Sequence, residues 1–113
     1  MATIDEGLAQ RIRDTLFELA DFADISERKM FGSLVFMVNG HMTCGAGDEG
    51  MMLRVGADRY VDALKHPHAE EMDFTGRPIT GFLYITAQGT ETDEDLTYWL
   101  DLSLGFILAQ PPK

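Results

Sequence analysis

Residues 33–46, with the sequence SLVFMVNGHMTCGA, decide the fold of this chain. Two mostly apolar runs, residues 34–38 and residues 41–46, flank the dipeptide Asn39-Gly40. Asn-Gly between apolar runs is a strong signal for a β-hairpin with a type I′ turn, because both residues tolerate the positive φ angles that this turn requires. The stretch therefore predicts two paired antiparallel strands.

Four further elements are predicted over residues 51–86. A glycine-rich turn leads into residues 51–55, which extend the strand pair into an antiparallel meander. Residues 57–65 have apolar side chains at helical spacing and are stopped by Pro67, which predicts a short helix. Residues 82–86 read as a final strand, and a short edge strand is predicted around residues 72–75.

A longer helix is predicted at the start of the chain. Thr3 and Glu6 form a capping box, and residues 4–22 behind it carry apolar side chains at helical spacing. Together with the strands, this helix predicts one α+β domain over residues 1–113. We expect two layers, with an antiparallel sheet of about five strands and helices packed against it.

A last helix is predicted behind Thr92, whose side chain can cap it. Its inward stripe is Leu96, Trp99, Leu100, Ser103, Leu104 and Ile107. Leu102, Phe106 and Leu108 widen this apolar arc, which indicates either deep packing or a surface for a partner.

The charge of the chain excludes some classes of function. Lys and Arg total 9 against 19 Asp and Glu, a formal net charge of −10. Such an acidic chain repels phosphate backbones, so we expect no direct binding of nucleic acid. The single cysteine, Cys44, excludes an internal disulfide. The N-terminus lacks a secretory signal and no apolar run is long enough to cross a bilayer, so we expect a cytoplasmic protein without a membrane segment.

The glycines of residues 45–50 formally match G-x-G-x-x-G, the pattern that cradles a pyrophosphate at a helix N-terminus. A strand is predicted to follow instead of a helix, and Asp48 and Glu49 would lie beside the phosphates. We therefore interpret the glycines as a hairpin turn.

Candidate ligands for a metal are scattered along the chain. The full set is His41, Cys44, His66, His68, Glu70 and Glu71. His66 and His68 could present two imidazoles, but Pro67 between them favours a surface loop and no companion pair has the spacing of metal ligands. Cys44 lies within a predicted strand, without an adjacent base. We therefore expect no metal site, no cofactor, no catalytic residue and no enzymatic activity.

Basic residues and methionines offer two further candidates. Arg28 and Lys29, with Arg54 and Arg77, form the one basic patch that the sequence suggests, and a solvated sheet edge carrying charges is the preferred interpretation. The methionines could form an adaptable partner surface. Because most of them fall in predicted strands, filling of the core is the preferred interpretation.

Several of these stretches resemble the N-terminal domain of the TfoX/Sxy family of competence regulators. The resemblance begins at Arg28-Lys29-Met30-Phe31-Gly32, where Lys29, Met30, Phe31 and Gly32 match the motif before the first strand pair. It continues, from about Leu8 to Leu108, through Asn39-Gly40-His41-Met42, Met52-Leu53-Arg54-Val55, Phe82-Leu83-Tyr84-Ile85, and Asp95, Leu96, Trp99 and Leu100.

This resemblance implies a two-layer fold in the order α-β-β-β-α-β-β-α, without the helical C-terminal domain of the family's regulators. It implies no catalytic residues, and Met30-Phe31-Gly32 is expected to be a packing and turn motif, with Phe31 in the core.

We therefore predict a stand-alone, non-enzymatic module for protein interaction or regulation, linked to competence or transcription. The expected interaction surface is Arg28, Lys29, Arg54, Leu102 and Phe106. A homodimer could use either the apolar arc of the last helix or a strand edge, and the sequence favours neither. The alternative is a protein that binds a small ligand or metal, or a cryptic enzyme, using a pocket near residues 66–80.

Overall fold

The computed structural model describes residues 4–30, 32–48, 50–73 and 78–113. The described chain contains three helices, six strands and one 3₁₀ turn. They are α1 (Glu6–Ala20), β1 (Ile25–Met30), β2 (Ser33–Val38), β3 (His41–Ala46), β4 (Gly50–Arg54), α2 (Ala57–Leu64), β5 (Ala69–Asp73), β6 (Pro78–Thr86), η1 (Ala87–Thr90) and α3 (Asp93–Ile107). No helix in these ranges is long and apolar enough to cross a membrane.

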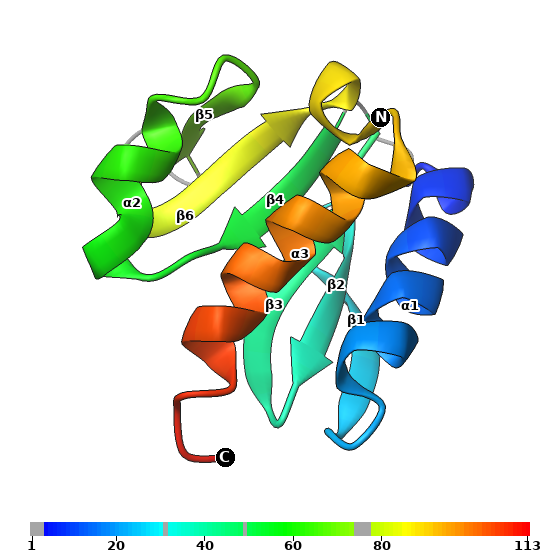
Figure 1. Ribbon diagram of the computed structural model, residues 1–113. Coiled ribbons are helices and arrows are strands. Elements are labelled where there is room, and N and C mark those ends of the chain that lie inside the picture. The colour runs from blue at the N-terminus through cyan, green and yellow to red at the C-terminus, as the bar shows by residue number, and fades with distance from the viewer. Residues whose placement is uncertain (1–3, 31, 49, 74–77) are drawn as a thin grey trace.

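The six strands form one antiparallel sheet in the order β1-β2-β3-β4-β6-β5. Figure 1 shows α1, α2 and α3 on the same side of this sheet, with α3 across its middle and the other two helices toward its borders. The fold is therefore a two-layer α+β arrangement, as predicted, with β1 and β5 as the two edge strands.

The predicted hairpin around Asn39-Gly40 is confirmed. Val38 pairs with His41, and the two residues between them, Asn39 and Gly40, have φ angles of 54° and 82°. Both angles are positive, as a type I′ turn requires. The C-terminal residues return to this turn, where the Lys113 amide donates to the Asn39 carbonyl at 2.9 Å.

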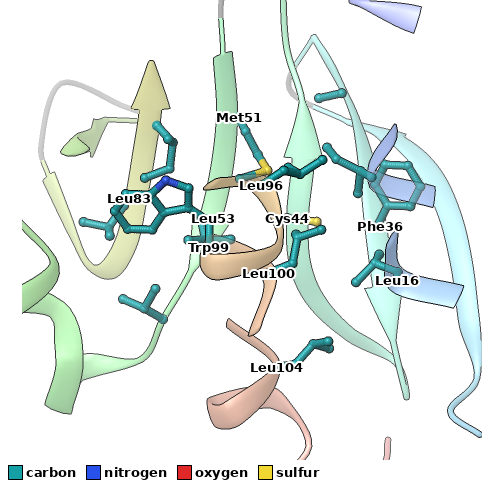
Figure 2. Packing of buried hydrophobic residues seen from close by; sticks show 14 of the residues in the cluster. Leu16, Phe36, Cys44, Met51, Leu53, Leu83, Leu96, Trp99, Leu100 and Leu104 are labelled. Atoms are coloured by element: carbon teal, nitrogen blue, oxygen red, sulfur yellow. The ribbon is translucent and has the colours of Figure 1, made fainter. Parts of the chain in front are cut away.

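The core lies between the helices and the sheet. The predicted inward stripe of the last helix is confirmed, because all six of its residues are buried in α3. Figure 2 shows Trp99 close to Leu53 and Leu83, while Leu16 of α1 lies close to Phe36. The indole Nε1–H of Trp99 donates to the Gly89 carbonyl at 3.1 Å, so the largest core side chain is also satisfied as a hydrogen-bond donor.

The opposite face of the sheet holds a second set of apolar side chains, because residues alternate between faces along a strand. Val35 and Met52 are buried there without belonging to the core cluster. The preferred interpretation of the methionines as core residues is right for Met51, which belongs to that cluster. It is wrong for Met37 and Met42, which are half-buried on β2 and β3 outside it.

Two predictions of elements need correction. The sheet has six strands rather than about five, because β1 was missed, and the order is α-β-β-β-β-α-β-β-η-α. Residues 26–29 of this edge strand are all exposed, so the strand lacks the alternation of apolar and polar residues by which a strand is predicted from sequence. The first helix begins at Glu6 and is capped by Asp5, whose Oδ1 accepts from the Leu8 amide at 3.0 Å. The predicted cap, Thr3, lies outside the described residues.

The glycine run forms the connection between β3 and β4, as expected for a hairpin turn. The Gly47 amide donates to the Gly50 carbonyl at 2.9 Å. A Cβ atom on Gly50 would lie 2.4 Å from the Ile85 carbonyl oxygen and 2.7 Å from the Tyr84 ring, whereas one on Gly45 would meet only ordinary contacts of 3.4 Å or more. The glycine at position 50 is therefore required by the close approach of β6.

We expect Gly50→Ala to lower the free energy of unfolding by about 1–3 kcal/mol, since the added methyl group must displace backbone of β6. Urea unfolding followed by circular dichroism measures this loss. Gly45→Ala is the matched control and should change the stability by less than about 0.5 kcal/mol. Equal effects of the two variants would contradict the close approach.

Candidate functional site

The residues expected to form one interaction surface lie in two separate regions. Arg28 and Lys29 are on β1 at the edge of the sheet, whereas Arg54 is on β4, three strands further in. Leu102 and Phe106 are one turn apart on α3. The structure brings Arg54 and Phe106 together but leaves Arg28 and Lys29 far from them, and Arg77 lies outside the described residues.

Arg54 is held between two aromatic rings. Its guanidinium carbon lies 5.5 Å from the centre of the Phe82 ring and 5.4 Å from that of Phe106. The Phe106 ring also presses against the backbone of Gly56, where a Cβ atom would lie only 2.3 Å from the ring. Arg54 and Phe106 therefore join the end of β4 to the end of α3.

A groove runs between α2 and α3. It has a volume of about 300 Å³ and is lined by Arg59, Asp62, Ala63, Tyr98 and Leu102. Tyr98 is 53% exposed although it is a large aromatic side chain. An open groove with an exposed aromatic wall is a typical feature of a surface that binds another protein.

The side chains at the two ends of the groove are packed against neighbouring residues. At one end the guanidinium of Arg59 lies 3.6 Å from the position of a Cβ atom on Gly105, so the lack of a side chain there makes room for it. At the other end the His66 ring stacks on the Tyr98 ring, with 6.2 Å between the ring centres. It also makes an edge contact with Trp99, with 4.6 Å between the ring centres. His66 thus helps to hold Tyr98 in place.

The histidines that suggested a metal site are engaged otherwise. The His68 amide donates to Nδ1 of His66 at 3.3 Å, and Nε2 of His41 lies 2.7 Å from the Pro111 carbonyl oxygen. The described ranges contain no group of three or more His, Cys, Asp or Glu side chains that could hold a metal ion. Of the loop predicted to border a pocket, residues 74–77 lie outside these ranges.

The edge strand β1 is tied to α1 by one ion pair. Nη2 of Arg13 donates to Oε1 of Glu27 at 2.7 Å. This hydrogen bond holds the pKa of the Glu27 carboxyl below its ordinary value. In the part of the chain that the structure describes, neither Arg28 nor Lys29 forms an ion pair, and both side chains are exposed.

The family motif lies where β1 turns into β2. Met30 is the half-buried last residue of β1, and Gly32 has a φ of 73°, in the left-handed region that favours glycine. Phe31, expected in the core, lies outside the described residues. The motif is thus followed directly by β2, the first strand of the Asn39-Gly40 hairpin.

A comparison with models of protein families matches residues 18–107 to the TfoX N-terminal domain. The match spans well over half of the chain and includes every strand together with α2 and α3. This chain belongs to the TfoX N-terminal domain family. The resemblance predicted from the sequence motifs is therefore confirmed. A search of curated proteins and a search of solved structures found no match.

Within this TfoX N-terminal domain, sequence reasoning missed Arg59, Asp62 and Tyr98 as residues of a surface. A weak signal was present, because Tyr98 and Leu102 are four residues apart and so share a face of α3 beside the buried stripe. That α2 would lie along this face could not be known before the sheet order placed β6 beside β4.

The free thiol of Cys44 is fully buried in the core, and burial raises its pKa far above the ordinary value. We expect Cys44 to be unreactive toward a disulfide reagent such as DTNB at pH 8, because the thiolate is the reactive form. Labelling should occur only as fast as the domain unfolds, and urea should accelerate it. Rapid labelling of the native protein would contradict this burial.

Proposed function

We propose that this TfoX N-terminal domain is a non-enzymatic interaction module that binds a segment of a partner protein in the groove between α2 and α3. The partner segment carries an apolar anchor residue flanked by Lys or Arg, and the role is regulatory, in competence or in transcription. The observation that carries the proposal is the exposed Tyr98 side chain on the wall of an open groove.

The shape of the groove supports an apolar anchor. Ala63 and Leu102 line it beside Tyr98, and Val61, 66% exposed, lies on the same helix as Ala63. Aromatic side chains in such positions dominate the binding energy of many protein interfaces, because they bury a large area at a small cost in side-chain entropy. A single Leu, Phe or Trp of a partner would suit this groove.

The charge around the groove supports basic flanks. Arg59 and Asp62 both line the groove, and Asp62 pairs with Lys65 at 3.3 Å, so the acidic surplus comes from the neighbouring helix face. Asp95 and Asp101 lie three residues before and after Tyr98, so both are close to it on the exposed side of α3. The formal net charge of −10 attracts a basic partner over a longer range and accelerates its association.

The side chains that could carry chemistry support a non-enzymatic role. Cys44 is buried with a raised pKa, His41 lies against a backbone carbonyl, and His66 packs against Trp99. The Cys44 thiol is therefore poorly suited to act as a nucleophile, and Nε2 of His41 is engaged by the backbone rather than directed at a substrate.

The proposal can be tested by selecting binders from a displayed library of short random peptides on the immobilised protein. We expect enriched peptides to share an apolar residue flanked by Lys or Arg. Leu102→Glu, which places a charge on the groove wall, should weaken their binding about tenfold or more, equivalent to about 1.4 kcal/mol.

Phe22→Ala is the matched control, because Phe22 is 75% exposed and lies in the turn after α1, away from the groove. It should bind the selected peptides as tightly as the wild type. Tyr98→Ala gives a second groove variant if Leu102→Glu lowers stability. Enriched peptides that bind all three variants equally, or no enrichment, would overturn the proposal.

A further inference from the structure

The outer edge of β1 differs from the other edge of the sheet. In the described residues β1 pairs only with β2, in an unbroken register from Ile25↔Val38 to Met30↔Ser33. At the opposite edge β5 has an irregular register before Asp73 and carries exposed Glu70 and Glu71. Bulges and like charges protect a strand edge from pairing, and β1 has a regular backbone with charges of both signs.

The backbone groups that face outward on β1 follow from the hairpin. The Asn39 amide donates to the Asp24 carbonyl at 2.8 Å, one position before β1 begins. Because hydrogen-bonded and non-hydrogen-bonded pairs alternate in an antiparallel ladder, Ser26, Arg28 and Met30 direct their amide and carbonyl groups toward β2. The groups of Ile25, Glu27 and Lys29 therefore point away from the sheet.

A second copy of the chain can use these outward groups by antiparallel pairing about a two-fold axis perpendicular to the sheet. One register sets Glu27 of each copy opposite Lys29 of the other, so that opposite charges meet twice. The neighbouring registers set Glu27 opposite Glu27, or Lys29 opposite Lys29, and like charges directly opposite destabilise a strand pair. The favoured register also sets Arg28 opposite Arg28 at the axis, so it has two attractive pairs against one repulsive pair, whereas each neighbouring register has a repulsive pair and no attractive one. The balance of charges thus favours one register, with a second copy of the chain as the partner.

An apolar flank accompanies this edge. Phe17 is 55% exposed and follows Arg13 by one helical turn, so it shares the side of α1 from which Arg13 reaches Glu27 on β1. Phe22 is exposed in the turn that joins α1 to β1. Figure 1 shows α1 along the β1 border of the sheet, so the two-fold axis would bring the α1 helices of both copies together and cover these side chains.

We propose that two copies of this chain associate through antiparallel pairing of their β1 strands, in the register that sets Glu27 of one copy opposite Lys29 of the other. The pairing joins the two sheets into one and places all helices on the same face. It goes beyond the proposed function, because the groove between α2 and α3 lies elsewhere and stays open in the dimer.

Sedimentation velocity over a range of protein concentrations tests the dimer directly on the full chain. We expect the wild type to dimerise, and Lys29→Glu to raise the dissociation constant about tenfold or more, because it sets like charges opposite one another twice. Glu27→Lys should raise the dissociation constant as well, and it also removes the ion pair between Glu27 and Arg13 of the same copy. Mixing the two variants in equal amounts should restore a heterodimer, since all four paired positions then carry opposite charges.

Two control variants show whether a loss of dimerisation is specific to the pairing of Glu27 with Lys29. Arg28→Ser should leave the dimer unchanged or tighten it, because the selected register sets the two Arg28 side chains opposite each other at the axis. Leu102→Glu should not affect dimerisation, so the groove proposal can fail independently. Thermal unfolding confirms that each variant is folded.

Three results would overturn the proposal: a wild type that is monomeric at all concentrations, a dimer that neither charge variant weakens, or a mixture of the two charge variants that forms no heterodimer.

Discussion

The burial of α3 against the middle of the sheet is the interaction on which the rest of the structure depends. Trp99, Leu100 and Leu104 enter the core from this helix, and the Ser103 hydroxyl lies 2.5 Å from the Arg54 carbonyl oxygen and 3.2 Å from that of Thr43. These contacts place α3 over β3 and β4. The other two helices can then cover only the flanks of the same face, so a groove opens between α2 and α3, and β1 ends the sheet beside α1.

The parts of the fold that could be predicted from the sequence are those with local causes. Asn39-Gly40 dictates its turn through backbone φ angles alone, and the stripe from Leu96 to Ile107 follows from helical spacing. β1 was not predicted, because its side chains at positions 26–29 are all exposed and the hydrophobic pattern does not distinguish it from a loop. Its strand character comes from pairing with β2, which is tertiary information.

The candidate site was predictable only in part, and for a similar reason. Leu102 and Phe106 were recognised because they widen the apolar arc of one helix. The groove also needs Arg59 and Asp62 from α2, and no spacing within either helix reveals that the two helices lie side by side. The proposed basic patch separates because Arg28 and Lys29 are on β1 whereas Arg54 is on β4, with β2 and β3 between them. The sequence shows which residue types are available for a site, whereas the order of the strands in the sheet determines which of them lie close together.

The central claim is that this domain works through surfaces left open by its one-sided helix layer, with β1 as a free edge in the monomer. Residue-resolved amide hydrogen exchange at low and high protein concentration tests it most directly. We predict that Ser26, Arg28 and Met30 are protected at both concentrations, whereas Glu27 and Lys29 exchange fast at low concentration and slowly at high concentration. Outward amides that exchange equally fast at both concentrations, or protection without alternation along β1, would contradict the account.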